Sequence, residues 1–237
     1  MRWAALVLAA LALTGCETTA EKSAKLERVA KQHKALAQHG LSITKLSTKV
    51  KVIETAVLSS PEGAAALVKL RNLSGTALSD VPIEITVTDP SGASIYSNNA
   101  PGLAPALVSV PLLPAHGRLT WIDDQLPLGG QPRSVSARLG EGQPAPAKMP
   151  TLNVEATSLS GQSAGEPEAE GRVVNHSTLA QHEVVVYALA RRAGRTVAAG
   201  RAVLPQVPAG ASTRFQLYFI GDPRGAQLQF TAVCAAA

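Results

Sequence analysis

The sequence predicts an all-β fold in which two tandem β-sandwich modules follow a cleaved N-terminal signal and a short helical stalk. Two observations predict the modules. Apolar and polar residues alternate in short runs after about residue 50, as in strands with one buried face. Several strand and turn patterns also occur twice in the same order. The N-terminal part is different, because residues 1–49 contain an apolar run followed by a lysine-rich pattern of helical period.

Residues 1–15 have the pattern of a secretory signal. Met1-Arg2 supplies a positive start, and the run from Trp3 to Leu13 is apolar. A helix that spans a bilayer needs about 20 apolar residues, so this run is too short to remain as a membrane span. The sequence therefore predicts that the segment is removed.

Leu13-Thr14-Gly15-Cys16 resembles the lipobox of bacterial lipoproteins. The resemblance implies that Cys16 receives a diacylglyceryl thioether, that the signal is then cut before Cys16, and that its new amine is often acylated, with palmitate as the expected acyl group. The membrane is thus the first expected partner, and the remaining chain is expected in the periplasm or at the cell surface. Glu17 stands where aspartate signals inner-membrane retention in proteobacterial lipoproteins, so the outer membrane is favoured if the cell has two membranes.

Residues 16–49 are predicted to form a basic helical stalk. Thr18-x-x-Glu21 matches a capping box, an apolar stripe at helical spacing follows, and Gly40 suits the position after a helix end. The chain has a net charge of +5, which becomes +4 without Arg2. Residues 16–51 alone contribute 8 − 3 = +5 and the remainder 4 − 5 = −1. This basic segment is either a solvated stalk or a surface for anionic lipid headgroups.

The second part of the chain has period two. Residues 81–87 alternate Val81, Ile83, Ile85 and Val87 with polar residues or proline, and the Asp89–Gly92 turn follows. This pattern predicts a half-buried strand that enters a hairpin. Leu119, Trp121, Val135, Ala137 and Leu139 continue the alternation.

The repeat defines two modules, at residues 50–140 and 151–237, joined by a Gly/Pro/Ala-rich linker at 141–150. Arg71-Asn72-Leu73-Ser74 recurs as Val174-Asn175-His176-Ser177, a shift of 175 − 72 = 103. Gly92 corresponds to Gly194, a shift of 102, and Pro114-Ala115-His116-Gly117 corresponds to Pro208-Ala209-Gly210-Ala211, a shift of 94. The recurring asparagines predict Asn-dependent turns.

Each module has the size and strand pattern of an immunoglobulin-like (Ig-like) sandwich. The order of an asparagine turn, an alternating strand ending near aspartate, a hairpin glycine and a proline-glycine turn resembles the Ig-like modules of bacterial envelope lipoproteins, particularly the FxLYD type. Residues 85–89 occupy the namesake position, with aliphatic residues in place of the aromatic ones. The resemblance implies a tandem Ig-like lipoprotein.

Aromatic residues make up only 3% of the chain. Trp121 is therefore expected to supply much of the packing in the first module, and Phe215, Leu217 and Phe219 in the second. Cys234 has no intramolecular partner once Cys16 is acylated, and it is predicted to be a buried apolar residue of the last strand.

The sequence predicts no enzyme, cofactor or metal. Gly161-Gln162-Ser163-Ala164-Gly165 matches G-x-S-x-G, but a nucleophile elbow requires a following helix, and Glu166-Pro167 follows here. The five histidines do not have ligand spacing. Asp123-Asp124 and the run Glu166, Glu168 and Glu170 are interpreted as solvated loops, with a calcium ion between the modules as the alternative. Nucleic acid is not expected, because no basic–aromatic groove is present.

One strand of the second module is apolar on both faces. Its outer face carries Val185, Tyr187 and Leu189 where the first module has Pro82, Glu84 and Thr86. Such a strand is usually covered on both sides, here by the first module, the stalk or a partner protein. These three residues are the candidate contact for a partner protein. The sequence thus predicts a non-enzymatic lipoprotein that acts in interaction or scaffolding, and the expected partner is another envelope protein. The alternative is a ligand-binding lipoprotein that serves a transporter or a cell-wall enzyme.

Overall fold

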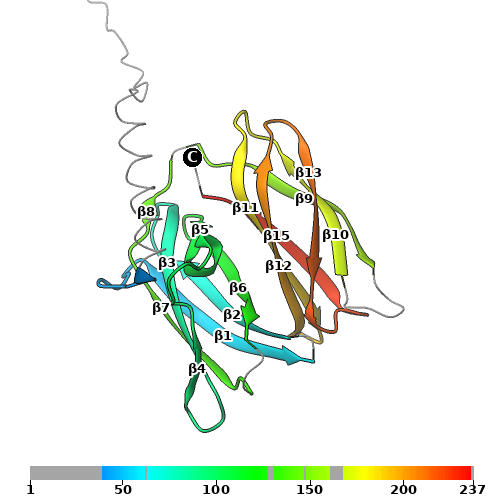
Figure 1. The fold of residues 1–237 in the computed structure, drawn as a ribbon. Coiled ribbons are helices and arrows are strands. Elements are labelled where there is room, and N and C mark those ends of the chain that lie inside the picture. Colours follow the sequence, from blue (N-terminus) through cyan, green and yellow to red (C-terminus); the bar gives the residue numbers. More distant parts are fainter. Residues whose placement is uncertain (1–38, 62, 128–130, 147, 161–167, 236–237) are drawn as a thin grey trace, which may run out of the picture.

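The computed structural model describes residues 39–61, 63–127, 131–146, 148–160 and 168–235, and it is built almost entirely of β-strands (Figure 1). Strands β1 to β8 form the first half of the molecule, and β9 to β15 form the second. Each half contains two packed antiparallel sheets, so the all-β, sandwich-like prediction is confirmed. Among the described residues, no helix is long and apolar enough to cross a membrane.

The first half pairs a three-stranded sheet with a second sheet centred on one strand. The three-stranded sheet has the order β1-β2-β6, with bounds Val50–Ser60, Gly63–Asn72 and Arg118–Leu126. In the second sheet, β3 (Leu78–Thr88) pairs on one side with β4 (Ser94–Ser97) and β5 (Ser109–Leu113). Its other side pairs with β7 (Ser134–Leu139) and β8 (Gln143–Pro144). β3 contains the predicted strand at 81–87.

The second half has the same strand pairing, but single strands replace the pairs of short strands that flank β3 in the first half. One sheet has the order β13-β10-β9, with bounds Ser212–Tyr218, Glu168–Asn175 and Leu152–Ser160. The other has the order β14-β12-β11-β15, with bounds Ile220–Gly221, Arg195–Val207, Gln181–Arg192 and Gln227–Val233. β11 and β12 meet at Ala193-Gly194, where φ angles of 49° and 77° give the left-handed residues of a tight hairpin.

The two predicted asparagine turns are present and have matching hydrogen bonds. Nδ2 of Asn72 donates to three carbonyls, those of Thr76 at 2.8 Å, Leu113 at 3.3 Å and Pro114 at 3.0 Å. Nδ2 of Asn175 donates to the corresponding carbonyls of Leu179 at 2.8 Å, Val207 at 3.1 Å and Pro208 at 3.1 Å. Each Oδ1 accepts from the backbone N–H and hydroxyl of the serine two residues later. Both asparagines are completely buried.

The halves differ between the hairpin and the proline-glycine turn. The shift between equivalent residues falls there from 102 to 94, so the first half has 102 − 94 = 8 additional residues. They belong to the excursion between β4 and β5, which includes the short helix α2 (Pro105–Val108). Asn98 bridges the resulting gap in the sheet, because Oδ1 accepts from Ile85 N–H at 2.7 Å and Nδ2 donates to the Ile83 carbonyl at 2.9 Å.

The predicted core residues are buried. Trp121 is fully buried in the first half, and its Nε1 donates to the carbonyl of Ala106 in α2 at 3.1 Å. Phe215, Leu217 and Phe219 are buried in the second half. Cys234 is also buried, although it lies one residue beyond β15, and its Sγ donates to Gln181 Oε1 at 3.3 Å.

The residues just before β1 and part of the predicted linker pack on the first half. Ser47 N–H donates to the Leu139 carbonyl at 2.8 Å, so residues before β1 are held against the end of β7. Within the predicted linker 141–150, β8 pairs with β3, and Ala145 N–H donates to the Ala77 carbonyl at 2.8 Å. The extended linker pattern also fits an edge strand, which explains how part of it adds to this sheet.

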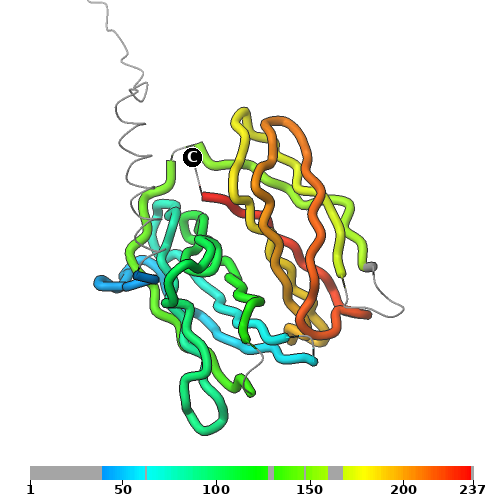
Figure 2. The backbone as a smooth tube through the Cα atoms, viewed as in Figure 1, coloured from blue at the N-terminus to red at the C-terminus, as the bar shows by residue number. Residues whose placement is uncertain are grey.

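The two halves lie side by side along the sheet faces that do not form their own cores (Figures 1 and 2). Strands β1, β2 and β6 of the first half contact β11, β12 and β14 of the second. At one end of this contact, Ile220 lies against Gly63, where an added Cβ would come within 2.7 Å of Ile220 Cδ1. The interface is therefore closely packed at Gly63.

Candidate functional site

Two residues singled out by the sequence lie outside the described residues. These are Cys16, the predicted lipidation site, and Ser163 of the G-x-S-x-G match. The strands on either side of the Ser163 segment are β9 and β10, whose ends pair at Ser160 and Glu168. Residues 16–38 of the predicted stalk also lie outside the described residues.

The predicted contact face on β11 is buried inside the molecule. Val185, Tyr187 and Leu189 are only 1%, 2% and 8% exposed. They belong to the apolar cluster that fills the first half, whereas the alternate residues Val184 and Val186 face the core of the second half. Both faces of β11 are thus covered, and the outer face packs on the first half of the molecule, which matches one of the alternatives that the sequence left open.

The opposing surface comes from β2 and β6. Val68 and Trp121 are paired across these strands and face the core of the first half. The next pair, Leu67 and Ile122, points to the other side of the sheet because side chains alternate along a strand. Both are buried, at 4% and 0% exposure, so they face the second half. The contact between the halves therefore has an apolar centre.

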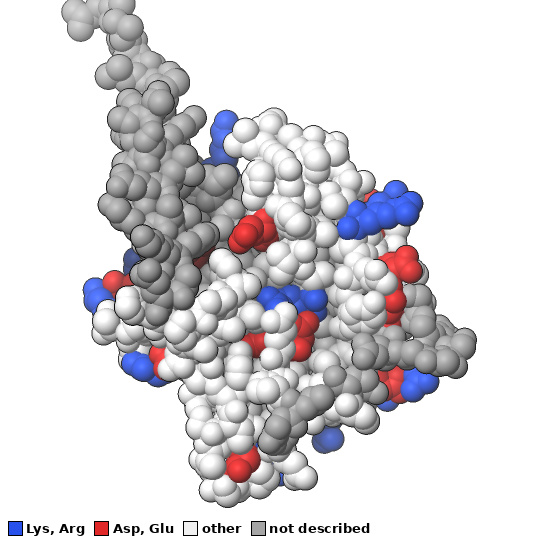
Figure 3. Space-filling view, viewed as in Figure 1, with Lys and Arg blue, Asp and Glu red and all other residues white. Residues whose placement is uncertain are grey.

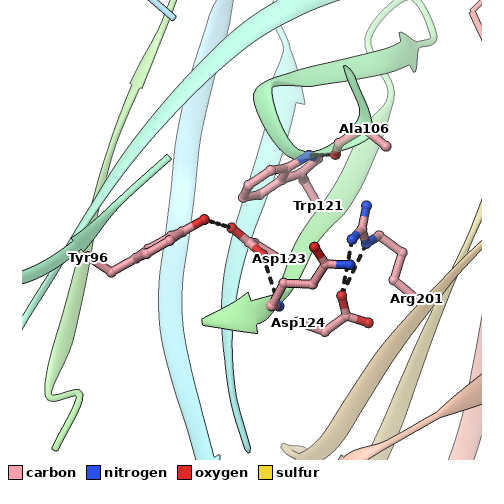
Figure 4. A network of polar contacts seen from close by, with 7 residues as sticks. Tyr96, Ala106, Trp121, Asp123, Asp124 and Arg201 are labelled. Atoms are coloured by element: carbon pink, nitrogen blue, oxygen red, sulfur yellow. Dashed lines mark hydrogen bonds and ion pairs between the residues drawn. The ribbon is translucent and has the colours of Figure 1, made fainter. Parts of the chain in front are cut away.

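A buried ion pair joins the halves beside this apolar centre. Nε and Nη2 of Arg201 on β12 each donate to Oδ1 of Asp124 on β6 at 3.2 Å. The two side chains are 4% and 14% exposed. Arg201 is directly opposite Tyr187 in the β11–β12 pair, so the cation lies next to the centre of the interface. Figure 4 shows Arg201 reaching toward Asp124 from the second half.

Asp123 has a different environment, although it is the neighbour of Asp124. Its Oδ2 accepts from the hydroxyl of Tyr96 on β4 at 2.8 Å, and its Oδ1 accepts from Gln125 N–H at 3.0 Å (Figure 4). Burial raises the pKa of the Asp123 carboxyl, while these hydrogen bonds and the positive charge of Arg201 oppose the rise. The two carboxylates diverge because they are consecutive residues of one strand.

The interpretation of these acidic residues as loops is wrong for the four that the structure describes, although Glu170 is exposed to solvent as expected and Glu166 lies outside the described residues. Asp123 and Asp124 belong to β6, and Glu168 and Glu170 belong to β10. The alternation of Leu119, Trp121 and Asp123 already continued the strand pattern and could have indicated this. The partner Arg201 could not be found in the sequence, because it lies 77 residues further along the chain.

Two polar atoms of the interface have no hydrogen-bond partner among the described residues. These are the Tyr187 hydroxyl and Nη1 of Arg201. Burial raises the pKa of the Tyr187 hydroxyl, so it remains neutral. An unpaired buried hydroxyl lowers stability, which indicates that the ring of Tyr187, rather than its oxygen, holds the interface together.

An open groove lies at the edge of the first half, between β1 and β7. Its volume is about 380 Å³, and its walls include Leu46, Val52, Leu73 and Ala137. The groove is away from the contact between the halves. At that contact, the described apolar side chains pack directly against one another.

The described residues do not assemble an obvious chemical centre. No group of three or more His, Cys, Asp and Glu residues among them could hold a metal ion. His176 interacts with Asn153 at 3.3 Å, and His116 is an exposed turn residue with φ of 54°. Burial raises the pKa of the Cys234 thiol to about 11, so this cysteine is a poor nucleophile. The polar groups between the halves are arranged to hold two sheets together.

No protein-family model and no curated protein sequence matches the chain. Among solved structures, it is similar to the exo-chitosanase CsxA of Amycolatopsis orientalis, with 12% identity and a TM-score of 0.29 over 77% of this chain. A complex of a variant of that enzyme with PNP-beta-D-glucosamine matches with 14% identity and a TM-score of 0.28 over 76% of this chain. The chain covers 26% of each of those longer chains. At these values, no activity carries over.

Proposed function

We propose that this protein is a lipid-anchored lipoprotein of the bacterial cell envelope that acts as a non-enzymatic interaction or scaffolding module. The observation that carries the proposal is Leu13-Thr14-Gly15-Cys16 at the end of the apolar run that begins at Trp3. Lipid on Cys16 would make attachment durable, because two or more acyl chains hold a protein far more firmly than one. Glu17 favours the outer membrane if the cell has two.

Two tandem Ig-like modules are the second part of the proposal. In each half, the first two strands form one sheet with a later strand, which is β6 in the first half and β13 in the second. β4 and β5 together occupy the place of β12, so β6 and β13 are equivalent. The asparagine turns Asn72 and Asn175 have equivalent partners in the two halves. These matches support duplication of one sandwich unit.

A scaffolding role is supported by the way the halves are joined. The apolar face of β11 and the Arg201–Asp124 pair hold the modules in one relative position. A ligand-binding lipoprotein would favour a concave pocket between its modules. The described side chains in that place instead pack together, and the two aspartates diverge and are engaged in other contacts.

Incorporation of labelled palmitate tests the proposal. The native chain should acquire the label and fractionate with the envelope, whereas Cys16→Ser should lose both properties because no thioether can form. Cys234→Ser is the matched control, since Cys234 is buried, and it should retain the label. Equal labelling of the native chain and Cys16→Ser would contradict the proposed anchor.

A further inference from the structure

Three basic residues form a row across the exposed end of the three-stranded sheet of the first half. Arg71 on β2 is directly opposite Lys51 on β1 and Arg118 on β6. We call Lys51, Arg71 and Arg118 the basic row. All three are exposed, and none of them forms an ion pair with a described residue. Directly opposite side chains on adjacent strands have Cβ atoms about 5 Å apart.

The basic row lies on the same sheet face as the contact with the second half. Arg71 and Leu67 are four residues apart on β2, and Arg118 and Ile122 are four apart on β6, so each pair shares a face. One end of this face is apolar and covered by the second half. The other end is basic and open to solvent.

The repeat shows that the fold does not require these charges. The equivalent positions in the second half are Asn153, Val174 and Ser212, which pair across β9, β10 and β13 in the same register. None of them is charged. Like charges that face each other across strands are destabilising, so the basic row has a cost that the second half avoids. An anionic ligand would offset that cost.

Neighbouring residues extend the basic row. Lys49, two residues before Lys51, is also exposed, and its carbonyl accepts from Leu73 N–H at 2.7 Å. Leu46 and Leu73 are 54% and 49% exposed, so apolar side chains border the charges. The residues that lead from the proposed anchor to β1 enter the fold here. By contrast, the face in Figure 3 carries its charged side chains in small separate groups among the described residues.

We propose that the basic row binds the anionic headgroups of the membrane in which the protein is anchored. An open sheet end with aligned cations suits an anionic surface, and each Lys or Arg near such a surface contributes to attraction. The exposed leucines can enter the headgroup region. This proposal rests on the proposed lipid anchor for its setting, but its chemistry involves different residues.

Vesicle binding by the full chain carrying Cys16→Ser tests the proposal, because no thioether-linked lipid then contributes. The probes are phosphatidylcholine vesicles and vesicles that also contain phosphatidylglycerol. Lys51→Gln, Arg71→Gln and Arg118→Gln together should lower partition onto the anionic vesicles by roughly 100-fold and leave partition onto the neutral vesicles unchanged. The N-terminal segment is the same in every variant, so it cannot cause this difference.

The matched control removes three exposed cations from the second half through Arg172→Gln, Arg195→Gln and Arg214→Gln. It should change partition by only a few-fold. The melting temperature of the basic-row variant should equal or exceed that of the parent chain, because opposed charges are removed.

Equal losses in the two triple variants, or no loss in the basic-row variant, would overturn the proposal. Binding of the parent chain to dextran sulfate without any preference for anionic vesicles would also overturn it, in favour of a soluble polyanion. The palmitate experiment is independent. An unlabelled native chain with an intact vesicle preference would refute the anchor alone, and a labelled chain without that preference would refute the basic row alone.

Discussion

Single buried polar side chains define the equivalent turns of the two halves. Asn72 and Asn175 each satisfy three carbonyls and two donors from a completely buried position. Asparagine is suited to this because its amide supplies both donors and acceptors. A carboxylate could not donate to the carbonyls, and a serine would not reach all of them. The residue type follows from the hydrogen-bond requirement of the turn.

We predict that Asn72→Ala and Asn175→Ala each lower the free energy of unfolding by about 3 kcal/mol, because several buried backbone groups lose their partners. Urea unfolding measures the change. Asn153→Ala is the control, since Asn153 is exposed, and it should have an effect of less than about 0.5 kcal/mol. Similar effects at all three positions would contradict the role given to the buried turns.

Asp123 should make stability depend on pH. Its pKa is raised in the folded protein by burial, so the folded state binds the proton more tightly than the unfolded state. The free energy of unfolding therefore falls as pH rises from about 3.9, the unfolded value, through the folded pKa. The stability of Asp123→Asn relative to the native protein should therefore rise as pH increases from about 4 to neutral, because only the native protein has an ionised carboxylate to bury.

Urea unfolding at the two pH values measures this difference, and Asp89→Asn supplies a control of opposite sign. The hydrogen bond from the Ser91 hydroxyl is the largest cause that lowers the pKa of Asp89. Native Asp89 should therefore be favoured over asparagine at neutral pH and lose this advantage in acid. An Asp123→Asn advantage that is independent of pH would contradict the assigned pKa direction.

Strand β11 shows how one element can serve two cores. Its even-numbered residues Val184 and Val186 pack in the second half, and its odd-numbered residues Val185 and Tyr187 pack against the first. Apolar residues on both faces indicated a covered strand from the sequence alone. The identity of the cover depends on how distant segments pack, so the sequence left several alternatives.

Tyr187 provides the test of this packing. Tyr187→Phe should leave stability unchanged or raise it slightly, because the hydroxyl has no partner among the described residues. Tyr187→Ser should lower the free energy of unfolding by about 3–5 kcal/mol, as for other truncations of large buried aromatic residues. Thermal or urea unfolding of the two variants distinguishes these effects. If Tyr187→Ser leaves the free energy of unfolding unchanged, the outer face of β11 is not packed inside the molecule.

Local patterns predicted the strand at residues 81–87, the strand that carries Val185, Tyr187 and Leu189, and the turns at Asn72 and Asn175. Alternation and turn chemistry depend on nearby residues, which is why the sequence shows them. The excursion with α2 was not predicted. In this excursion, the Asn98 side chain makes the hydrogen bonds to the backbone of Ile83 and Ile85 that a neighbouring strand would otherwise make. These residues are 15 and 13 positions away from Asn98 in the sequence. The Arg201–Asp124 pair was missed for the same reason. The signal at Cys16 remains a prediction from sequence.

The contact between the two halves should couple their stabilities. Arg201→Met leaves the carboxylate of Asp124 without its partner and should lower the free energy of unfolding by about 3 kcal/mol. Adding Asp124→Leu should recover much of this loss, because an apolar pair can replace a buried ion pair. Arg138→Met breaks the pair with Glu84, in which the arginine is 56% exposed rather than 4% as in Arg201, and should cost less than about 1 kcal/mol.

Trp121 fluorescence during urea unfolding measures this coupling, since Trp121 lies in the first half and Arg201 in the second. The transition of Trp121 should move with Arg201→Met and coincide with the loss of strand signal in circular dichroism. A Trp121 transition that does not respond to Arg201→Met would show that the halves unfold independently.

The mass of the mature N-terminus tests the central claim most directly. If the protein is a lipid-anchored envelope lipoprotein, mass spectrometry of the native chain purified from membranes should find an N-terminal peptide that begins at Cys16 and carries a diacylglyceryl group. An unmodified Cys16, whether within a retained signal or at a free N-terminus, would contradict the account.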